Sequence, residues 1–280
     1  MQIIDGKAVA MSVREALKEE VSALTTHGET IGLAVVLVGE DGASRVYVRN
    51  KINACKEIGI TSTLVELPES ATEDEIFAVV DNLNNRDDVH GIIVQLPLPS
   101  HVNTDNVLSA VNPAKDVDGC HYVQKGKLWT GVPETLPCTP YGCIELLKHY
   151  NVEIAGKNAV VVGRSNLVGR PLAELLLREN ATVTICHSKT KDLAEVTRRA
   201  DILCVAIGKG KFVTADMVSD GAVVIDVGMN RDENGKLCGD VDYENVCNKC
   251  SYITPVPGGV GPMTVTMLMK NTVEAYKRNR

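Results

Sequence analysis

The chain has 280 residues, of which 44% are hydrophobic and 23% are charged, and its formal net charge at pH 7 is −7. This length suits one large domain or two modest ones, each able to bury a core of its own. The excess of acidic residues argues against nucleic acid or an acidic membrane surface as the main partner, and no apolar stretch approaches the length of a membrane span.

The cysteines and the start of the chain predict where the protein works. An odd number of cysteines, nine, scattered among apolar neighbours is typical of reduced cytosolic thiols. Cys247 and Cys250 form a C-x-x-C pair, but no second pair stands at zinc spacing, so we expect no metal site. Residues 1–7 contain no basic segment that leads into an apolar run. We therefore expect no signal peptide and a cytoplasmic location.

The first hundred residues alternate between helical and strand patterns. Asp5 is placed to cap one helix, and Thr72-Glu-Asp-Glu75 is a capping box that opens another. The apolar runs at 31–38 and 91–96 are typical of strands buried on both faces of a parallel sheet. In chain order the pattern predicts helix 5–26, strand 31–38, helix 44–58, strand 60–67, a helix from 72 and strand 91–96.

The rest of the chain predicts a second unit of the same kind. Residues 112–138 are rich in Gly, Pro and Asp and are predicted to be loop. A helix from Thr139 follows, and a glycine-rich loop at 254–262 precedes a final helix from Met263. Strands are predicted at 159–162, 181–186, 201–206 and 222–227. The expected fold is α/β, with two lobes that each carry a parallel sheet and a cleft between them.

The stretch from Ala159 to Leu177 predicts the first β–turn–α unit of a Rossmann-like dinucleotide-binding domain. Four apolar residues end at Gly163, a polar turn follows, and Gly169 opens an apolar-periodic helix. This arrangement favours a phosphate group at the helix N-terminus. The pattern departs from G-x-G-x-x-G, because Ser165 replaces the second glycine and the last glycine comes one residue late.

The end of the next predicted strand indicates NADP rather than NAD. NAD-specific folds usually carry an Asp or Glu there, which binds the ribose 2′-hydroxyl. Here Ser188 and Lys189 follow the strand, and Arg164 lies on the first turn. A hydroxyl and two cations suit a 2′-phosphate.

Other chemically capable residues precede this domain. Tyr47 and Lys51 are four residues apart and share one face of the predicted helix 44–58. Gln95 ends a buried strand, where it binds either a ligand or local backbone. Asp118 belongs to a pair of loop carboxylates that on their own are usually solvated. The glycines of 254–262 suit close backbone approach to a flat ligand.

Together these motifs closely resemble the bifunctional methylenetetrahydrofolate dehydrogenase/methenyltetrahydrofolate cyclohydrolase family. The resemblance covers essentially the whole chain, with the motifs in the family's order. The matching segments are Tyr47-xxx-Lys51, Val94-Gln95-Leu-Pro-Leu-Pro99, Lys115-Asp-Val-Asp118-Gly, Pro137-Cys-Thr-Pro140, Val162-Gly-Arg-Ser165, Cys186-His-Ser-Lys-Thr190 and Pro255-Val-Pro-Gly-Gly-Val-Gly-Pro-Met-Thr264.

The resemblance implies two reactions and a set of residue roles. Hydride would pass from 5,10-methylenetetrahydrofolate to NADP⁺, and water would then open the methenyl cation to 10-formyltetrahydrofolate. Lys51 is implied as general acid/base, Gln95 as the group that orients it, Tyr47 as a stacking partner of the aminobenzoate ring, and Asp118 as an acceptor for the pterin. The implied folate pocket also includes Pro257, Gly258, Gly259 and Pro262.

The resemblance also implies the cofactor contacts and the domains. Gly163, Arg164, Ser165 and Ser188 match the family's NADP contacts, and Met229 stands where many relatives carry Ile and is expected to pack against the cofactor. Residues 1–139 with the C-terminal helix 264–280 would form the folate-binding catalytic lobe, and 140–263 the NADP-binding domain. A homodimer is expected.

Two other functions stay open on the sequence. A shikimate-dehydrogenase-like oxidoreductase would also place a substrate lobe before an NADP lobe, but a flat pterin suits the first-lobe residues better than a small polyol acid. A catalytically silent NADP-binding regulator is disfavoured because every catalytic position holds a capable residue. A turnover assay separates these possibilities.

Overall fold

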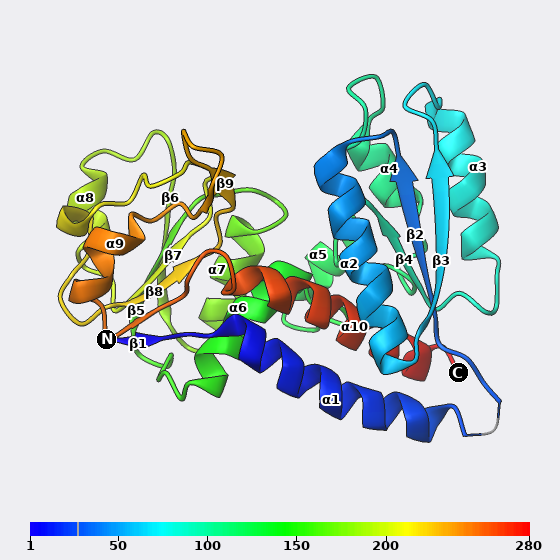
Figure 1. Cartoon of the computed structure of the whole chain (residues 1–280), viewed down its shortest axis with the longest axis horizontal. Helices are drawn as coiled ribbons and strands as arrows, with labels where there is room; N and C mark the ends of the chain where they lie inside the picture. The colour runs from blue at the N-terminus through cyan, green and yellow to red at the C-terminus, as the bar shows by residue number, and fades with distance from the viewer. Residues whose placement is uncertain (27) are drawn as a thin grey trace. The chain divides into compact units, whose positions relative to one another are not determined.

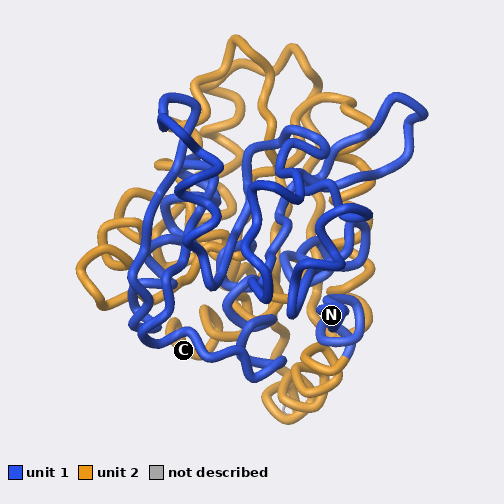
Figure 2. The backbone as a smooth tube through the Cα atoms, turned by 90° about the vertical axis from the view of Figure 1, so that its left-hand side faces the viewer, with its two compact units in different colours: residues 1–11, 139–264 blue, residues 12–138, 265–280 orange. Residues whose placement is uncertain are grey.

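A computed structural model of the chain describes residues 1–26 and 28–280 and contains two units built on separate parallel sheets. Unit 1 comprises residues 1–11 and 139–264, and unit 2 comprises residues 12–138 and 265–280, as Figure 2 shows in blue and orange. The prediction of an α/β fold with two parallel-sheet lobes is confirmed. Residues 1–11, which the sequence had assigned to the first lobe, belong to unit 1 because β1 (Gln2–Ile3) pairs with β11 (Tyr252–Ile253).

Unit 2 is built on a three-stranded sheet of order β3-β2-β4, all parallel. Every residue of the central strand β2 is buried, which explains its unbroken apolar sequence. Ala34, Val36 and Val38 form one core with side chains of α3 and α4, while α2 packs against the sheet as well (Figure 1). The elements are β2 (Gly32–Val38), α2 (Gly42–Ile58), β3 (Thr61–Leu67), α3 (Glu73–Asn84), β4 (Gly91–Val94), α4 (Thr104–Ala110) and α5 (Tyr122–Trp129).

Two helices of unit 2 begin at side-chain caps. Thr72 and Glu75 form the predicted capping box, with the Thr72 hydroxyl accepting from the Glu75 amide at 3.3 Å. Helix α2 begins at Gly42 rather than Ser44, because the Asp41 carboxylate accepts from the Ser44 amide at 2.7 Å. Helix α5 was not predicted and lies within 112–138. Its first turn is capped by the His121 ring, which accepts from the Val123 amide at 3.0 Å.

Unit 1 is built on a six-stranded sheet of order β1-β11-β8-β7-β5-β6, all parallel. The chain passes from β5 to β6 on one side and then returns to β7 on the other side of β5. The strand order therefore reverses at β5, and ligands of open α/β sheets bind beside the carboxyl ends of the strands at such a point. The elements are α6 (Cys138–His149), β5 (Asn158–Val162), α7 (Gly169–Arg178), β6 (Thr182–Cys186), α8 (Leu193–Thr197), β7 (Ile202–Val205), β8 (Val223–Asp226), β9 (Asn230–Arg231), β10 (Leu237–Cys238) and α9 (Tyr243–Val246).

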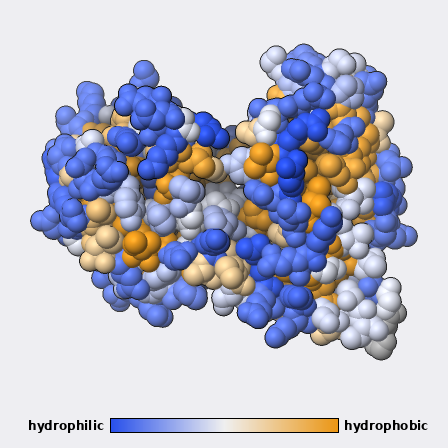
Figure 3. All heavy atoms as spheres, viewed as in Figure 1, coloured by the Kyte–Doolittle hydropathy of each residue, from blue (hydrophilic) through white to orange (hydrophobic). Residues whose placement is uncertain are grey.

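Two long helices contribute residues to both units. Helix α1 (Gly6–Leu24) begins in unit 1 and continues in unit 2, and α10 (Val260–Arg278) does the same. Asp5 caps α1 as predicted, since its Oδ1 accepts from the Ala8 amide at 3.0 Å. Hydrophilic residues cover most of the face drawn in Figure 3. Across residues 1–26 and 28–280, no helix has both the length and the apolar character that a membrane span requires.

Candidate active site

Lys51 lies on the buried face of α2, among the helix's apolar residues. Only 8% of Lys51 is exposed, and its Nζ donates a hydrogen bond of 2.9 Å to Oε1 of Gln95. Gln95 is the first residue after β4 and is also 8% exposed. Its Nε2 donates to the Leu96 carbonyl at 2.6 Å, which turns Oε1 toward the amine. The structure thus brings together two of the residues predicted from the sequence.

The surroundings of Lys51 favour its neutral form. Burial lowers the pKa of the Lys51 amine, and the nearby Asp118 carboxylate opposes this effect. The thiols of Cys120 and Cys138 also face this group of side chains, and burial raises both thiol pKa values well above the usual range. Both thiols are therefore neutral near pH 7, and among the neighbouring side chains Asp118 has the largest effect in raising the pKa of Lys51.

Tyr47 lies one helical turn before Lys51 on α2, as the sequence predicted. Its side chain is half-buried, and burial raises the pKa of the phenol. Tyr47 therefore keeps its proton near pH 7 and carries a neutral aromatic ring one helical turn from Lys51.

The loop that carries Asp118 is held by two buried residues that the sequence did not single out for this role. The Asp116 carboxylate accepts from the amides of Gly119, at 3.0 Å, and His121, at 2.8 Å. Asn271, on α10, donates from Nδ2 to the carbonyls of Val117 and Leu136, both at 2.8 Å. Asp116 is 4% exposed, so the expectation that both loop carboxylates are solvated is wrong for this one.

The predicted β–turn–α unit is present in unit 1, and its glycines are needed for close packing. Gly163 has φ +129°, and a Cβ there would lie 2.2 Å from the Ala206 carbonyl oxygen at the end of β7. A Cβ on Gly169 would lie 2.3 Å from the Gly163 carbonyl oxygen. The turn therefore leaves backbone rather than side chains at the point where the strand order reverses, as a dinucleotide site requires.

Ser165 occupies the amides at the start of α7. Its hydroxyl accepts from the amides of Val168, at 3.1 Å, and Gly169, at 3.3 Å, and its carbonyl accepts from Arg170 at 3.1 Å. The sequence predicted a phosphate at these amides. These amides are already bound to Ser165. The exposed side chains of this turn, Arg164 among them, take no part in these bonds.

The other predicted cofactor residues lie at the same carboxyl edge of the sheet. Ser188 and Lys189 are exposed in the turn after β6, which Thr190 closes by accepting from the His187 amide at 2.9 Å. Met229 follows β8 and is 44% exposed. The hydroxyl of Ser188 and the cation of Lys189 after β6, together with Arg164 in the turn after β5, fit a 2′-phosphate, and residues 187–191 contain no carboxylate.

The predicted substrate loop belongs to unit 1. It ends at Gly259, because α10 begins at Val260 and takes Pro262 into its first turn. The Gly258 carbonyl accepts from the Lys7 amide at 3.0 Å, and a Cβ on Gly6 would lie 1.8 Å from the Gly259 carbonyl oxygen. The loop backbone is thus fixed against the start of α1, with Pro257 exposed.

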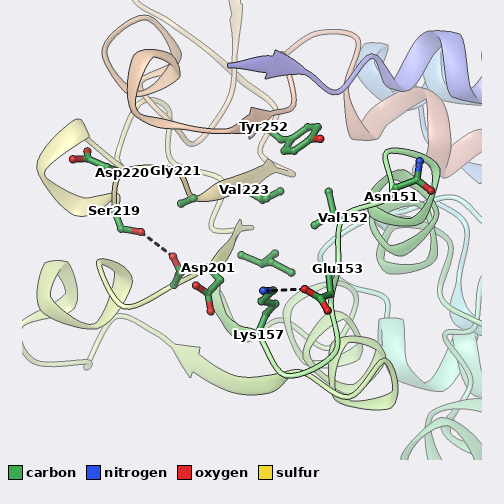
Figure 4. A pocket seen from close by; sticks show the side chains of 13 residues that line it. Asn151, Val152, Glu153, Lys157, Asp201, Ser219, Asp220, Gly221, Val223 and Tyr252 are labelled. Carbon is green, nitrogen blue, oxygen red and sulfur yellow. Dashed lines mark hydrogen bonds and ion pairs between the residues drawn. The ribbon is translucent and has the colours of Figure 1, made fainter.

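A hollow of about 320 Å³ in unit 1 lies away from all these residues. Asp201, Ala222 and Lys157 line it, next to the amino ends of β7, β8 and β5 (Figure 4). None of the predicted site residues lines this hollow. In the part of the chain that the structure describes, no group of three His, Cys, Asp or Glu side chains is placed to hold a metal ion.

The fold and the glycine turn define an α/β enzyme of the dinucleotide-binding class, with a buried lysine in its other unit. Two family models match the chain: the catalytic domain of tetrahydrofolate dehydrogenase/cyclohydrolase at residues 4–118, and the NAD(P)-binding domain of the same enzyme at residues 137–280. The chain belongs to the tetrahydrofolate dehydrogenase/cyclohydrolase family.

Individual relatives agree over the full length. The bifunctional protein FolD of Bacillus anthracis is 56% identical over 276 residues, which cover 99% of this chain and 96% of the relative. The crystal structure of FolD from Campylobacter jejuni is 49% identical, with a TM-score of 0.98 and full coverage of both chains. The Trypanosoma brucei enzyme, solved with NADP and an inhibitor, is 41% identical with a TM-score of 0.95. The match covers 99% of this chain and 97% of the T. brucei chain.

The alternative of a shikimate-dehydrogenase-like enzyme is not supported. A solved shikimate dehydrogenase from Peptoclostridium difficile is only 10% identical and reaches a TM-score of 0.50, so the likeness concerns the fold alone.

Proposed function

We propose that this chain oxidises 5,10-methylenetetrahydrofolate with NADP⁺ and then hydrolyses the product to 10-formyltetrahydrofolate. In the first reaction a hydride leaves the one-carbon bridge, giving the 5,10-methenyl cation and NADPH. In the second, water adds to the cationic carbon, a proton is released, and the ring opens at N5. Family membership over both units carries this proposal, and the buried Lys51–Gln95 pair supplies its chemistry.

Lys51 is the general acid/base of the hydrolysis in this proposal. The methenyl substrate is a cation, and a protonated amine beside it is unfavourable. Burial lowers the pKa of Lys51, so the amine can be neutral when the cation binds and can take a proton from the attacking water. The Gln95 carbonyl oxygen accepts a hydrogen bond from either form of the amine, so it can orient Lys51 before and after proton transfer.

The remaining residues bind and orient the folate. Tyr47 offers a neutral ring for stacking on the aminobenzoate group. Asp118 accepts hydrogen bonds from the pterin N–H groups, in a loop that Asp116 and Asn271 hold. Pro257, Gly258, Gly259 and Pro262 are further folate-binding residues in this proposal.

NADP supplies the hydride acceptor of the first reaction, and residues of unit 1 bind it. Gly163 and Ser165 shape the turn after β5, and Met229 contributes an apolar contact from the segment after β8. Arg164 and Ser188 bind the 2′-phosphate. In this proposal unit 1, residues 1–11 and 139–264, forms the cofactor domain, and unit 2, residues 12–138 and 265–280, forms the folate-binding lobe.

We also propose that the protein works as a homodimer in the cytoplasm, without nucleic acid or membrane partners. The net charge of −7 supports the last point. Light scattering of the purified protein tests the dimer.

The two reactions are tested by coupled assays on the purified chain. NADPH formation at 340 nm reports the dehydrogenase, and loss of the methenyl absorbance reports the hydrolysis. Formation of NADPH without loss of the methenyl product would reduce the proposal to a dehydrogenase alone.

A further inference from the structure

We infer that Asp240 is a positioning residue for the cofactor, which it serves by holding the loop after β7. Asp240 is fully buried in unit 1 and lies just beyond the β9–β10 hairpin. Its Oδ2 accepts from the amides of Ile207, at 2.6 Å, and Gly208, at 3.0 Å. Its Oδ1 accepts from the amide of Lys209, at 2.7 Å, and from Nδ2 of Asn230, at 2.9 Å. Four donors therefore converge on one buried carboxylate.

The loop that Asp240 holds lies at the carboxyl edge of the sheet, beside the glycine turn. Ala206, which begins this loop, has its carbonyl oxygen 2.2 Å from the position of a Cβ on Gly163. Strands β5 and β7 are neighbours, and the strand order reverses between them. The loop 206–209 is thus one wall of the crevice in which a dinucleotide binds on this class of sheet.

The direction of the three amides limits what the loop can offer the cofactor. Consecutive N–H groups at Ile207, Gly208 and Lys209, with Gly208 at φ +65°, form a concave anion site, and Asp240 fills it. These amides are therefore not available to a cofactor phosphate. The loop meets the cofactor with its carbonyl groups and side chains, in the backbone shape that the carboxylate imposes.

A second buried carboxylate fixes Asp240 in turn. Asp226, the last residue of β8, accepts from the amides of Asp240 and Val241, both at 2.9 Å, and from Gly228 at 3.0 Å. A Cβ on Gly239 would lie 1.8 Å from Oδ2 of Asp226, and a Cβ on Gly228 would lie 2.2 Å from Oδ1 of Asp240. Both glycines are needed because the two carboxyl groups fill the space that a side chain would occupy. The backbone around Asp226 and Asp240 is therefore shaped to hold these two side chains.

The test compares Asp240→Asn with Asp220→Asn, a matched change at an exposed carboxylate. The inference rests on the proposed use of NADP, so binding of NADPH is measured directly by fluorescence titration. Amide hydrogen exchange at residues 207–209 is measured without cofactor, and hydrolysis of methenyltetrahydrofolate, which consumes no cofactor, reports on unit 2.

For Asp240→Asn we expect NADPH to bind about tenfold more weakly or worse, because the amide group cannot accept from all four donors. Exchange at 207–209 should become faster, while hydrolysis stays within about twofold and Asp220→Asn changes none of these. Faster exchange with unchanged NADPH binding would overturn the inference, and so would unchanged exchange.

A milder variant covers the case in which Asp240→Asn does not fold. Asn230→Ala removes one of the four donors and should raise the dissociation constant of NADPH about threefold, with faster exchange at 207–209. Unchanged binding in this folded variant would overturn the inference. Failure of the proposed function is distinguishable, because the unaltered protein would then either not bind NADPH or bind it without turning over the folate.

Discussion

Lys51 and Gln95 are joined by a hydrogen bond of 2.9 Å that links the buried face of α2 to the end of β4. The Gln95 amide nitrogen is bound to the Leu96 carbonyl, so its oxygen is the group that faces the amine. An uncharged acceptor orients the amine without stabilising its positive charge as a carboxylate would. The pairing therefore holds Lys51 in place while burial keeps its pKa low.

Replacing Lys51 with Met should abolish the hydrolysis and leave cofactor binding intact. A positioned acid/base contributes on the order of 10²-fold to 10⁴-fold to a rate, so a loss of at least about 10²-fold is expected. The measurement is methenyl turnover, with NADPH titration in parallel. Lys56→Met, at an exposed position of the same helix, is the control. A Lys51 variant as active as the unaltered protein would refute the role.

Replacing Gln95 with Glu should move the pH profile of the hydrolysis to higher pH. A carboxylate beside Lys51 favours the charged amine and raises its pKa, so a higher pH is needed to deprotonate it. Gln95→Leu should instead slow the reaction without this upward displacement, because it removes the acceptor and adds no charge. A profile for Gln95→Glu that coincides with that of the unaltered enzyme would contradict the account.

The buried amine also predicts how stability depends on pH. The pKa of Lys51 is lowered in the folded protein, mainly by burial, and returns to about 10.4 in the unfolded chain. Between these two values the unfolded chain binds more protons, so the Lys51 contribution to the free energy of unfolding rises with pH. Urea unfolding at several pH values up to about 10 should show the unaltered protein gaining stability relative to Lys51→Met. A difference that is the same at every pH would count against burial as the cause.

Replacing Asn271 with Ala should weaken folate binding without touching the cofactor site. The change leaves the carbonyls of Val117 and Leu136 without their donor and loosens the loop of Asp118. We expect unfolding to require about 1–3 kcal/mol less free energy and KM for the folate to rise. Asn279→Ala, which removes an exposed bond to Ala114, is the matched control. Loss of NADPH affinity instead of folate affinity would show that the loop is not the route of the effect.

Arg164 and Ser188 should determine the preference for NADP. Changing either to Ala should raise KM for NADP⁺ about tenfold and alter KM for NAD⁺ much less, because only NADP carries the 2′-phosphate. Lys191→Ala, at an exposed cation farther along the turn after β6, is the control. Equal effects on both cofactors would mean that these side chains do not bind the 2′-phosphate.

The sequence predicted the elements whose patterns are local. The unbroken apolar run of β2, the capping box at Thr72 and the glycine turn after β5 each depend on neighbours in the chain, and all three are present. Helix α5 was missed because Gly126 and a short length hide its pattern. Strand β1 was missed because two residues carry no periodicity, and its pairing with β11 joins opposite ends of the chain.

The residues of the candidate site also divide into those that the sequence predicts and those that it does not. Lys51 and Gln95 stand in motifs that can be read along the chain, and the structure shows their contact. Asp116 carried a usable signal, since aspartate is common in turns, where its side chain accepts from nearby backbone amides, as it does here from Gly119. Asn271 and Asp240 had none, because each acts on backbone groups that are distant in sequence.

The measurement that tests the account most directly follows one sample of purified protein through both reactions. With 5,10-methylenetetrahydrofolate and NADP⁺, or NAD⁺ in parallel, we expect NADPH to form and the methenyl product then to disappear, with NADP⁺ clearly preferred. Turnover with NAD⁺ alone would contradict the assignment of Arg164 and Ser188. No turnover with either cofactor would contradict the proposed function as a whole.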